Sequence, residues 1–333
     1  MIDAIVGTPS PAEPLTAAGS VELAYLVRSG MVESRHLGAA VVVDPAGIPL
    51  RVLGDATSAL VYPRSTLKLL QTIAVLDSGA PLSGERLALA TASHAGTPEH
   101  IRVVREILAQ ANLSESALGC PADWPGDPRS RAAVVAAGGT ASPIYMNCSG
   151  KHAAFLLACV TNGWPTDSYL EAAHPLQRSI AATVEDYTGE HIVHTGLDGC
   201  GAPVHAVTLA GLARGIGRVA AGRGADAAAL RSAILDNPWA IDGPGRANTV
   251  TVEKLGIIAK LGAEGVMVMG AADGTAVAVK ILDGSLRAAT LVALTLLVSV
   301  GAVPQDDADE VLAATLETVL GGGVPVGELA VAF

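Results

Sequence analysis

The sequence predicts a mixed α/β fold in which an antiparallel sheet is built from both ends of the chain and a helical lobe is inserted between them. Runs of β-branched and apolar residues separated by turn residues indicate the strands; they are residues 21–28, 38–43 and 49–54 near the start and 265–269 and 275–281 near the end. From Ser65 to about Asp236, apolar residues recur with the helical period. A catalytic cleft is expected where the helical lobe meets the sheet.

The 333 residues are expected to form one catalytic domain. Its sheet lobe is predicted at about 20–62 and 250–333, and its helical lobe at about 65–245. Apolar residues make up 50% of the chain and aromatic residues 3%, so a large core must consist of Ala, Val and Leu. Other predicted elements are a short strand at 87–89, a helix opened by Thr97, helices at 150–162, 169–187, 285–300 and 305–320, and glycine-rich turns at 211–224 and 321–323.

The charge of the chain argues for a small-molecule partner. The net charge is -11, the pI is about 5.1, and no run of basic residues suggests a nucleic-acid surface. Residues 1–20 contain Asp3 and Glu13 and lack a long apolar stretch, so they do not predict a signal peptide, and a cytoplasmic location is expected. The apolar run 288–303 is short for a membrane span and predicts a buried helix.

The first candidate for chemistry is Ser65 with Lys68, at the start of a predicted helix. A spacing of three places hydroxyl and amine on one helix face, where a neutral lysine could take the serine proton. The same pattern also occurs on solvated helix faces. The chain contains five lysines against sixteen arginines, so a lysine here can mark a position where an amine that is able to lose its proton is needed.

The second candidate is Ser93 with His94, in a loop that precedes a helix N-terminus. Such a loop could present a nucleophile or a hydrogen-bond donor to a developing oxyanion. In the alternative interpretation, Thr97 simply caps the helix and Ser93 satisfies a backbone group.

The third candidate combines the segment from Cys148 to His152 with the segment from Asp198 to Gly201. Two thiols near glycine turns and the amine of Lys151 could converge on a metal such as zinc, with His152 and Asp198 beside the ligands. Alternatively, Cys148 and Cys200 are small buried side chains without a metal. Cys159 is expected in the core, and Cys120 shows no role.

The fourth candidate lies near the C-terminal strands. Lys260, followed two residues later by Gly262, could point an amine at a ligand that approaches the strand closely. Arg246 ends a Gly-Pro-Gly turn and could hold a carboxylate through both of its terminal nitrogens. Both segments could also be ordinary turns with exposed cations.

Taken together, these motifs resemble the L-asparaginase II proteins of the rhizobial type, from about Val21 to the C-terminus. The segments that carry the resemblance are Val32–Gly38, Pro63–Ser65 with Lys68, Ala92–His94, Asn147–His152, Asp198–Pro203 and Gly262–Gly265. The resemblance implies a fold similar to that of serine β-lactamases and penicillin-binding proteins, which agrees with a sheet built from both chain ends.

The resemblance also implies a function, namely hydrolysis of L-asparagine to L-aspartate and ammonia by a homodimer. It implies two catalytic pairs, Ser65 with Lys68 and Ser93 with Lys260, and a zinc ion held by Cys148, Lys151, Cys200 and a water. Side chains and backbone expected to bind the substrate are Arg64, His94, Asp198, Arg246 and Gly262, with the two arginines as candidates for its α-carboxylate. Two residues depart from the expected pattern: Leu261 replaces a hydroxyl residue, and Asn248 stands where an acid is expected.

Three rival functions remain open at this point. A glutaminase or a β-lactamase-like amidase could use the same fold and the same serines. In a different class, a zinc-binding or thiol-sensing protein without catalysis would use Cys148 and Cys200, and its serines would be structural.

Overall fold

The computed structural model describes residues 13–333. The prediction that residues 1–20 do not form a signal peptide therefore rests partly on residues 1–12, which lie outside the described residues. Within that part, the main element is an eight-stranded antiparallel sheet with the strand order β11-β12-β1-β2-β10-β9-β8 and with β3 paired to β2. Its strands are β1 (Val21–Arg28), β2 (Met31–Val43), β3 (Pro49–Leu53), β8 (Ile258–Gly262), β9 (Val266–Gly270), β10 (Ala276–Ile281), β11 (Val319–Gly321) and β12 (Val324–Val331).

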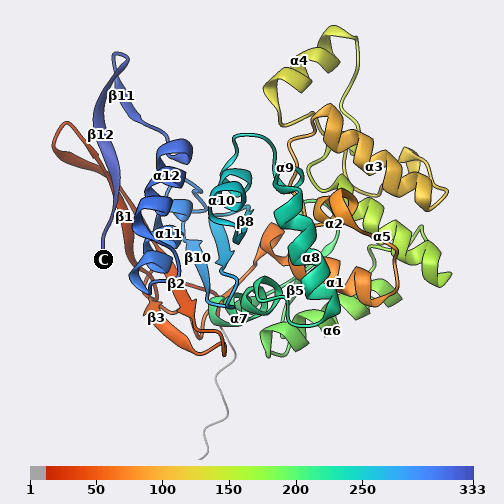
Figure 1. The fold of residues 1–333 in the computed structure, drawn as a ribbon, viewed down its shortest axis with the longest axis horizontal. Coiled ribbons are helices and arrows are strands. Elements are labelled where there is room, and N and C mark those ends of the chain that lie inside the picture. Colours follow the sequence, from red (N-terminus) through yellow and green to blue (C-terminus); the bar gives the residue numbers. More distant parts are fainter. Residues whose placement is uncertain (1–12) are drawn as a thin grey trace, which may run out of the picture.

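Both chain ends contribute to this sheet, as the sequence predicts. The two halves join where β2 pairs with β10, with Val43 opposite Ala276, and where β1 pairs with β12, with Ala24 opposite Val331. The long β2 is shared, because its first half pairs with β1 and its second half with β3. The predicted fold class, an antiparallel sheet from both ends with an inserted helical lobe, is confirmed (Figure 1).

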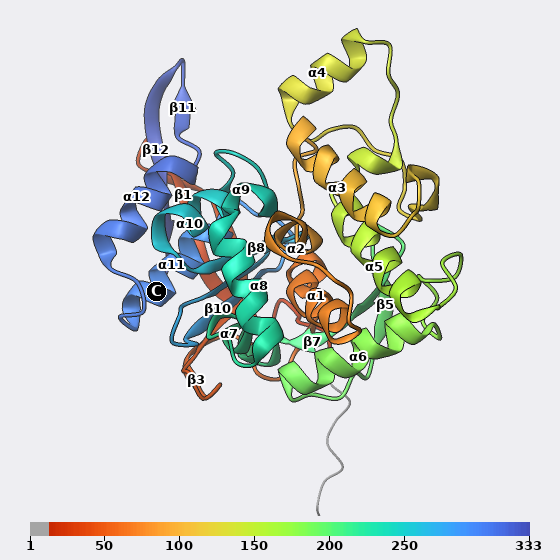
Figure 2. The ribbon, with the colours of Figure 1, turned by 45° about the vertical axis from the view of Figure 1, so that its right-hand side comes forward.

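The inserted segment is mainly helical. Its helices are η1 (Arg64–Leu67), α1 (Lys68–Asp77), α2 (Gly84–Ala90), α3 (Pro98–Gln110), η2 (Glu115–Ala117), α4 (Pro128–Ala136), η3 (Pro143–Tyr145), α5 (Ser149–Asn162), α6 (Pro175–Thr188), α7 (Leu209–Ala220), α8 (Ala225–Asp236), α9 (Pro238–Ile241) and α10 (Ala247–Leu255). Four short strands form two separate pairs outside the main sheet. They are β4 (Leu60–Val61) with β7 (Val207–Thr208), and β5 (Thr195–Leu197) with β6 (Pro203–His205). In Figures 1 and 2, α1, α2, α3, α5 and α6 form a group beside the sheet, and α4 projects from it.

Helices cover the centre of the sheet. α7 and the C-terminal α11 (Ala289–Ser299) both pack against β9 and β10, where successive residues are buried although they point to opposite faces. α12 (Gln305–Thr315) packs on α10 and α11. The run 288–303 thus contains the predicted buried helix, and no helix in residues 13–333 is both long and apolar enough to span a membrane.

Four predicted elements differ from the structure. The glycine-rich segment 211–224, predicted as a turn, lies mostly in α7 (Leu209–Ala220). Residues 87–89 belong to α2 and not to a strand, because a short apolar run does not distinguish a buried helix from a buried strand. The helix predicted at 169–187 begins at Pro175, after His174 caps its first turn. The helix predicted at 305–320 ends at Thr315 and is followed by the β11–β12 hairpin, whose turn contains Gly322 and Gly323 of the predicted glycine turn.

Candidate active site

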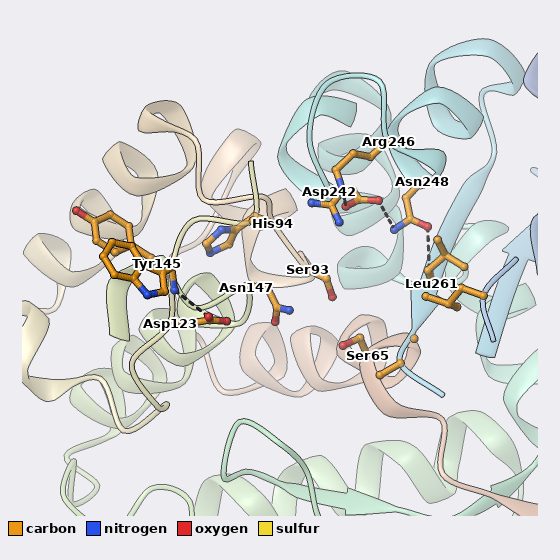
Figure 3. A pocket seen from close by; sticks show the side chains of 15 residues that line it. Ser65, Ser93, His94, Asp123, Tyr145, Asn147, Asp242, Arg246, Asn248 and Leu261 are labelled. Carbon is orange, nitrogen blue, oxygen red and sulfur yellow. Dashed lines mark hydrogen bonds and ion pairs between the residues drawn. The ribbon is translucent and has the colours of Figure 1, made fainter. Parts of the chain in front are cut away.

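A cavity of about 260 Å³ lies where the helical lobe meets the sheet. Residues from both parts of the chain line it (Figure 3); they are Ser65, Ser93, His94, Asp123, Trp124, Gly126, Tyr145, Asn147, Asp242, Arg246, Asn248, Leu261, Gly262, Ala263 and Leu286. Of the residues predicted to be functional, Ser65, Ser93, His94, Arg246 and Gly262 line the cavity, whereas Arg64 and Asp198 do not.

Two lysines meet at the hydroxyl of Ser93. Lys68, the first residue of α1, donates hydrogen bonds to the Ala92 carbonyl (2.6 Å) and to Ser93 Oγ (3.1 Å). Lys260, in the middle of β8, approaches from the sheet and lies 2.8 Å from Ser93 Oγ. Both lysine side chains are buried. The structure therefore brings both Lys260 and Lys68 to the Ser93 hydroxyl, whereas Lys68 makes no hydrogen bond to Ser65.

The environment of Lys260 favours its neutral form. Burial, followed by the nearby charge of Lys68, lowers the pKa of Lys260 from 10.5 to about 7. Desolvation and a neighbouring cation both disfavour the charged amine. Lys260 can therefore accept a proton near neutral pH, which an ordinary lysine cannot do.

Ser65 occupies a different position in the site. It lies in the 3₁₀ turn η1 just before α1, and its hydroxyl makes no hydrogen bond to any residue of the described chain within 13–333. Arg64, directly before it, has a φ of +51°, a conformation that is uncommon for residues other than glycine. Gly262 of β8 packs so closely that an added Cβ would lie 2.7 Å from the Pro63 carbonyl and 3.3 Å from the Ser65 nitrogen. A side chain at position 262 would therefore close the space beside Ser65.

The loop that carries Ser93 and His94 is held by the backbone on both sides. The Ser93 N–H donates to the Ile241 carbonyl, the His94 N–H to the Asn147 carbonyl, and the Ala95 N–H to the Asp242 carbonyl. Thr97 caps α3 as predicted. The loop thus joins α9 and the segment before α5 at the cavity wall.

His94 is fixed in one neutral form. Ser149 Oγ donates to the Ile144 carbonyl, so it must accept the bond from His94 Nε2 (2.9 Å), while His94 Nδ1 accepts from the Gly96 N–H. Burial, together with the neighbouring His100, holds the pKa of His94 well below its usual value. With Nε2 donating and Nδ1 already accepting, His94 is not available as a general base.

A polar chain connects Arg246 to the strand of Lys260. Arg246 Nε pairs with Asp242 (2.8 Å), and the other oxygen of Asp242 accepts from the Asn248 amide (3.0 Å). The amide oxygen of Asn248 accepts from the Leu261 N–H (2.8 Å). The departure at Asn248 therefore supplies both a donor and an acceptor, which a carboxylate could not do.

The predicted metal ligands lie together behind the cavity wall. Lys151 Nζ lies 3.1 Å from Cys200 Sγ, and the Cys148 and Cys200 thiols are close enough to influence each other's pKa. All three are buried. Asp198 Oδ2 is 3.7 Å from Cys200 Sγ, while its other oxygen accepts from Arg64 Nε (2.7 Å).

The charges in this cluster influence one another. The neighbouring Cys200 thiol and the nearby lysines hold the pKa of the Cys148 thiol well below its usual value, against the effect of burial. The pKa of Lys151 is raised, because the attraction of the two cysteines exceeds the opposing effect of burial. A buried thiolate is a donor that soft or borderline metals prefer, whereas Lys151, whose pKa is raised, has to lose its proton before its amine can bind a metal.

His152 is not part of the ligand cluster. Its Nδ1 forms a hydrogen bond with the Tyr169 hydroxyl (2.7 Å), and its buried Nε2 has no partner within residues 13–333. In that part of the chain, no group of three His, Cys, Asp or Glu residues is arranged to hold a metal. A metal here would therefore need the Lys151 amine in addition to the two thiols. Cys159 is buried in α5 as predicted.

Sequence reasoning missed Asp123, Trp124 and Asp242 as cavity residues. All three lie in segments rich in Pro, Gly and Asp, where no periodic pattern indicates the direction of a side chain. The Asp-Gly-Pro-Gly-Arg turn was the available signal for Asp242, because it places a carboxylate four residues before Arg246.

None of the curated proteins compared with the chain matches its sequence. Among solved structures, the chain is similar to a β-lactamase from Mycobacterium bovis, with 20% identity, coverage of 84% of this chain and 95% of that one, and a TM-score of 0.42. The family model described as L-asparaginase II matches residues 24–331. The chain therefore belongs to the L-asparaginase II family.

Proposed function

We propose that the protein hydrolyses the side-chain amide of L-asparagine to L-aspartate and ammonia, by transfer of the acyl group to a serine. Family membership supports an amidohydrolase of the asparaginase type. The observation that carries the mechanism is the contact of Lys68 and Lys260 with the Ser93 hydroxyl at the edge of a cavity. Two buried amines on one hydroxyl form a unit for proton transfer.

The proton route starts from the neutral form of Lys260. Ser93 gives its proton to Lys260 and takes one from Lys68, so a positive charge moves from Lys68 to Lys260. Lys68 is then neutral; to accept the proton of Ser65, three residues before it, Lys68 must come into hydrogen-bond contact with the Ser65 hydroxyl, a contact that the two side chains do not make in this structure. No net proton enters or leaves the site in this step.

Ser65 is proposed as the nucleophile. Its hydroxyl lines the cavity and has no hydrogen-bond partner in residues 13–333, so it is free to contact a substrate. It also lies at the N-terminal end of α1, where the helix dipole stabilises negative charge. Attack of Ser65 Oγ on the amide carbon forms an ester and releases ammonia, which takes its proton from Lys68. Water then hydrolyses the ester by the reverse proton route.

A zinc ion is proposed at Cys148, Lys151 and Cys200. The donor set supports it, since two thiols and an amine are buried together and Lys151 Nζ lies 3.1 Å from Cys200 Sγ. When bound, the metal would supply a fixed positive charge that orients polar groups near Asn147, whose amide oxygen lies 3.0 Å from Cys148 Sγ. The proton route above involves none of these ligands.

The test combines ammonia release with trapping of the intermediate. The purified protein is mixed with L-asparagine, quenched in acid and digested, and the acylated peptide is identified by mass spectrometry. We expect ammonia release and an aspartyl adduct on the peptide that contains Ser65. An adduct on Ser93 would reverse the roles of the two serines, and normal turnover by both Ser65→Ala and Ser93→Ala would contradict the serine mechanism.

The same preparation separates the rival functions. Faster ammonia release from L-glutamine would indicate a glutaminase, and turnover of a chromogenic β-lactam would indicate a β-lactamase-like amidase. Bound zinc without release of ammonia from any amide would favour a non-catalytic zinc-binding or thiol-sensing protein.

A further inference from the structure

We propose that Asp123 binds the α-ammonium group of the amino-acid substrate and so restricts the site to free α-amino acids. This inference rests on the proposed function and extends it to a residue on the segment that carries α4.

The first argument is elimination among the carboxylates of the cavity. Within residues 13–333, those that line it are Asp123 and Asp242. Asp242 is buried and already binds Arg246 and Asn248. Asp123 is exposed and has no basic side chain within ion-pair distance in the described chain; one of its oxygens accepts the Trp124 N–H (2.8 Å). Its second oxygen is therefore available to a cation that enters the cavity.

The second argument is the fixed position of Asp123. Its backbone forms two hydrogen bonds with Ser142, at 3.2 and 2.9 Å, which close the base of the projecting segment. Four residues later, the Asp127 N–H donates to the Ala95 carbonyl, two residues after Ser93. Asp123 is thus connected to the loop of the proton-transfer unit. In the view of Figure 3, Asn147 lies between Asp123 and the two serines.

The third argument is charge complementarity across the cavity. Arg246 is half exposed, and its terminal nitrogens make no hydrogen bond to residues 13–333, because the contact with Asp242 uses Nε. Gly126 lies beside this guanidinium, so an added Cβ would be 3.6 Å from Nη1. A carboxylate from one side and a guanidinium from the other match the ammonium and the carboxylate of an α-amino acid.

The proposed role of Asp123 distinguishes L-asparagine from an analogue without the ammonium group. Succinamic acid carries the same amide and carboxylate as L-asparagine but has no ammonium group. If Asp123 binds the ammonium, Asp123 contributes to the turnover of L-asparagine and contributes nothing to that of succinamic acid.

The variant Asp123→Asn tests this, since Asn keeps the size and the acceptor for the Trp124 N–H. We expect kcat/KM for L-asparagine to fall by about 10- to 100-fold, as for loss of a charged hydrogen bond, with the value for succinamic acid changed by less than about 3-fold. The matched control is Asp127→Asn, on the same segment, where Asp127 caps α4 and lies outside the cavity. It should leave both values unchanged.

Equal losses on both substrates, or no loss on L-asparagine, would overturn the inference. Binding of L-aspartate and of succinate, measured by calorimetry on the wild type and on Asp123→Asn, provides a readout without catalysis. The variant should lose affinity for L-aspartate and keep its affinity for succinate. If the wild type releases no ammonia from L-asparagine, the proposed function fails, and calorimetry still decides the role of Asp123: equal affinities of the wild type and the variant for L-aspartate would exclude it.

Discussion

Lys260 Nζ lies 2.8 Å from Ser93 Oγ, although 167 positions separate the two residues in the sequence. The contact exists because β8 lies in the sheet directly beside the loop that follows α2, and it joins the two parts of the molecule at the cavity. Lys68 reaches the same oxygen from α1. The proposed catalysis therefore depends on three elements that meet only in the folded chain.

Replacing Lys260 by Met should abolish most of the activity. The substitution keeps an unbranched side chain of similar length and removes the amine that accepts the Ser93 proton. We expect kcat to fall by about 100-fold or more, the usual range for loss of a general base. The control is Lys254→Met, because Lys254 is a surface lysine paired with Glu310. Ammonia release measures both variants, and an active Lys260→Met would contradict the proton route.

The activity should rise with pH around neutrality. The pKa of Lys260 is lowered by burial and by Lys68 to about 7, so its neutral fraction grows as pH rises through that value. We expect kcat/KM to increase through pH 7 and to level off about one unit higher. A profile of ammonia release against pH measures this. A rate that is flat from about pH 6 to 8 would argue against a neutral Lys260 as proton acceptor.

The same lowered pKa predicts how stability depends on pH. Between about 7 and 10.5, the unfolded chain keeps a proton on Lys260 that the folded chain has released. Rising pH in this window therefore increases the free energy of unfolding, and below it the cost of the buried charge is fully present. Lys260→Met removes this cost. In urea unfolding, the stability of the variant relative to the wild type should decrease from about pH 7 to about pH 9, and a constant difference would contradict the lowered pKa.

The proposed zinc site predicts a specific loss of metal. We expect the purified protein to contain about one zinc per chain and Cys200→Ser to lose most of it, because a hydroxyl is a poor ligand for this metal. Cys159→Ser is the matched control, since Cys159 is equally buried but lies away from Lys151 in the core of α5. Elemental mass spectrometry measures the content. Equal zinc contents in the wild type, Cys200→Ser and Cys159→Ser would indicate that the metal binds elsewhere.

The sequence predicted the central strands of the sheet but missed strands toward its edges. β12 was missed because Pro325 and Gly327 are unfavourable in strands. The structure explains Gly327, since an added Cβ would lie 1.9 Å from the Val27 carbonyl of β1. Gly327, which in the sequence suggests the end of a strand, is thus the residue that allows β12 to pair closely with β1.

The sequence indicated which types of residue form the candidate site, but it indicated less well which of these residues contact one another. The spacing of Ser65 and Lys68 placed both on one face, but it could not show that Lys68 would reach Ala92 and Ser93, because those contacts depend on the packing of α1 against the loop after α2. Asp123 gave no signal, since a single acid in a proline-rich loop has no periodic neighbours.

Asn248 offers the sharpest test of the polar chain from Arg246 to β8. Its amide donates to Asp242 and accepts from the Leu261 N–H, and the Asn248 side chain is itself buried. Asn248→Ala leaves both partners unsatisfied and should lower the free energy of unfolding by about 2–4 kcal/mol. Asn248→Asp keeps the acceptor for Leu261 but places a second carboxylate next to Asp242.

The two substitutions should therefore differ in their pH dependence. Two carboxylates at this distance cannot both ionise easily, so Asn248→Asp should be stable when one of them holds a proton and should lose stability as pH rises and that proton is released. The Asn248→Ala defect should not change between about pH 5 and 8. Urea unfolding across this range measures both variants. If Asn248→Asp matches the wild type throughout, the donor role of the Asn248 amide is wrong.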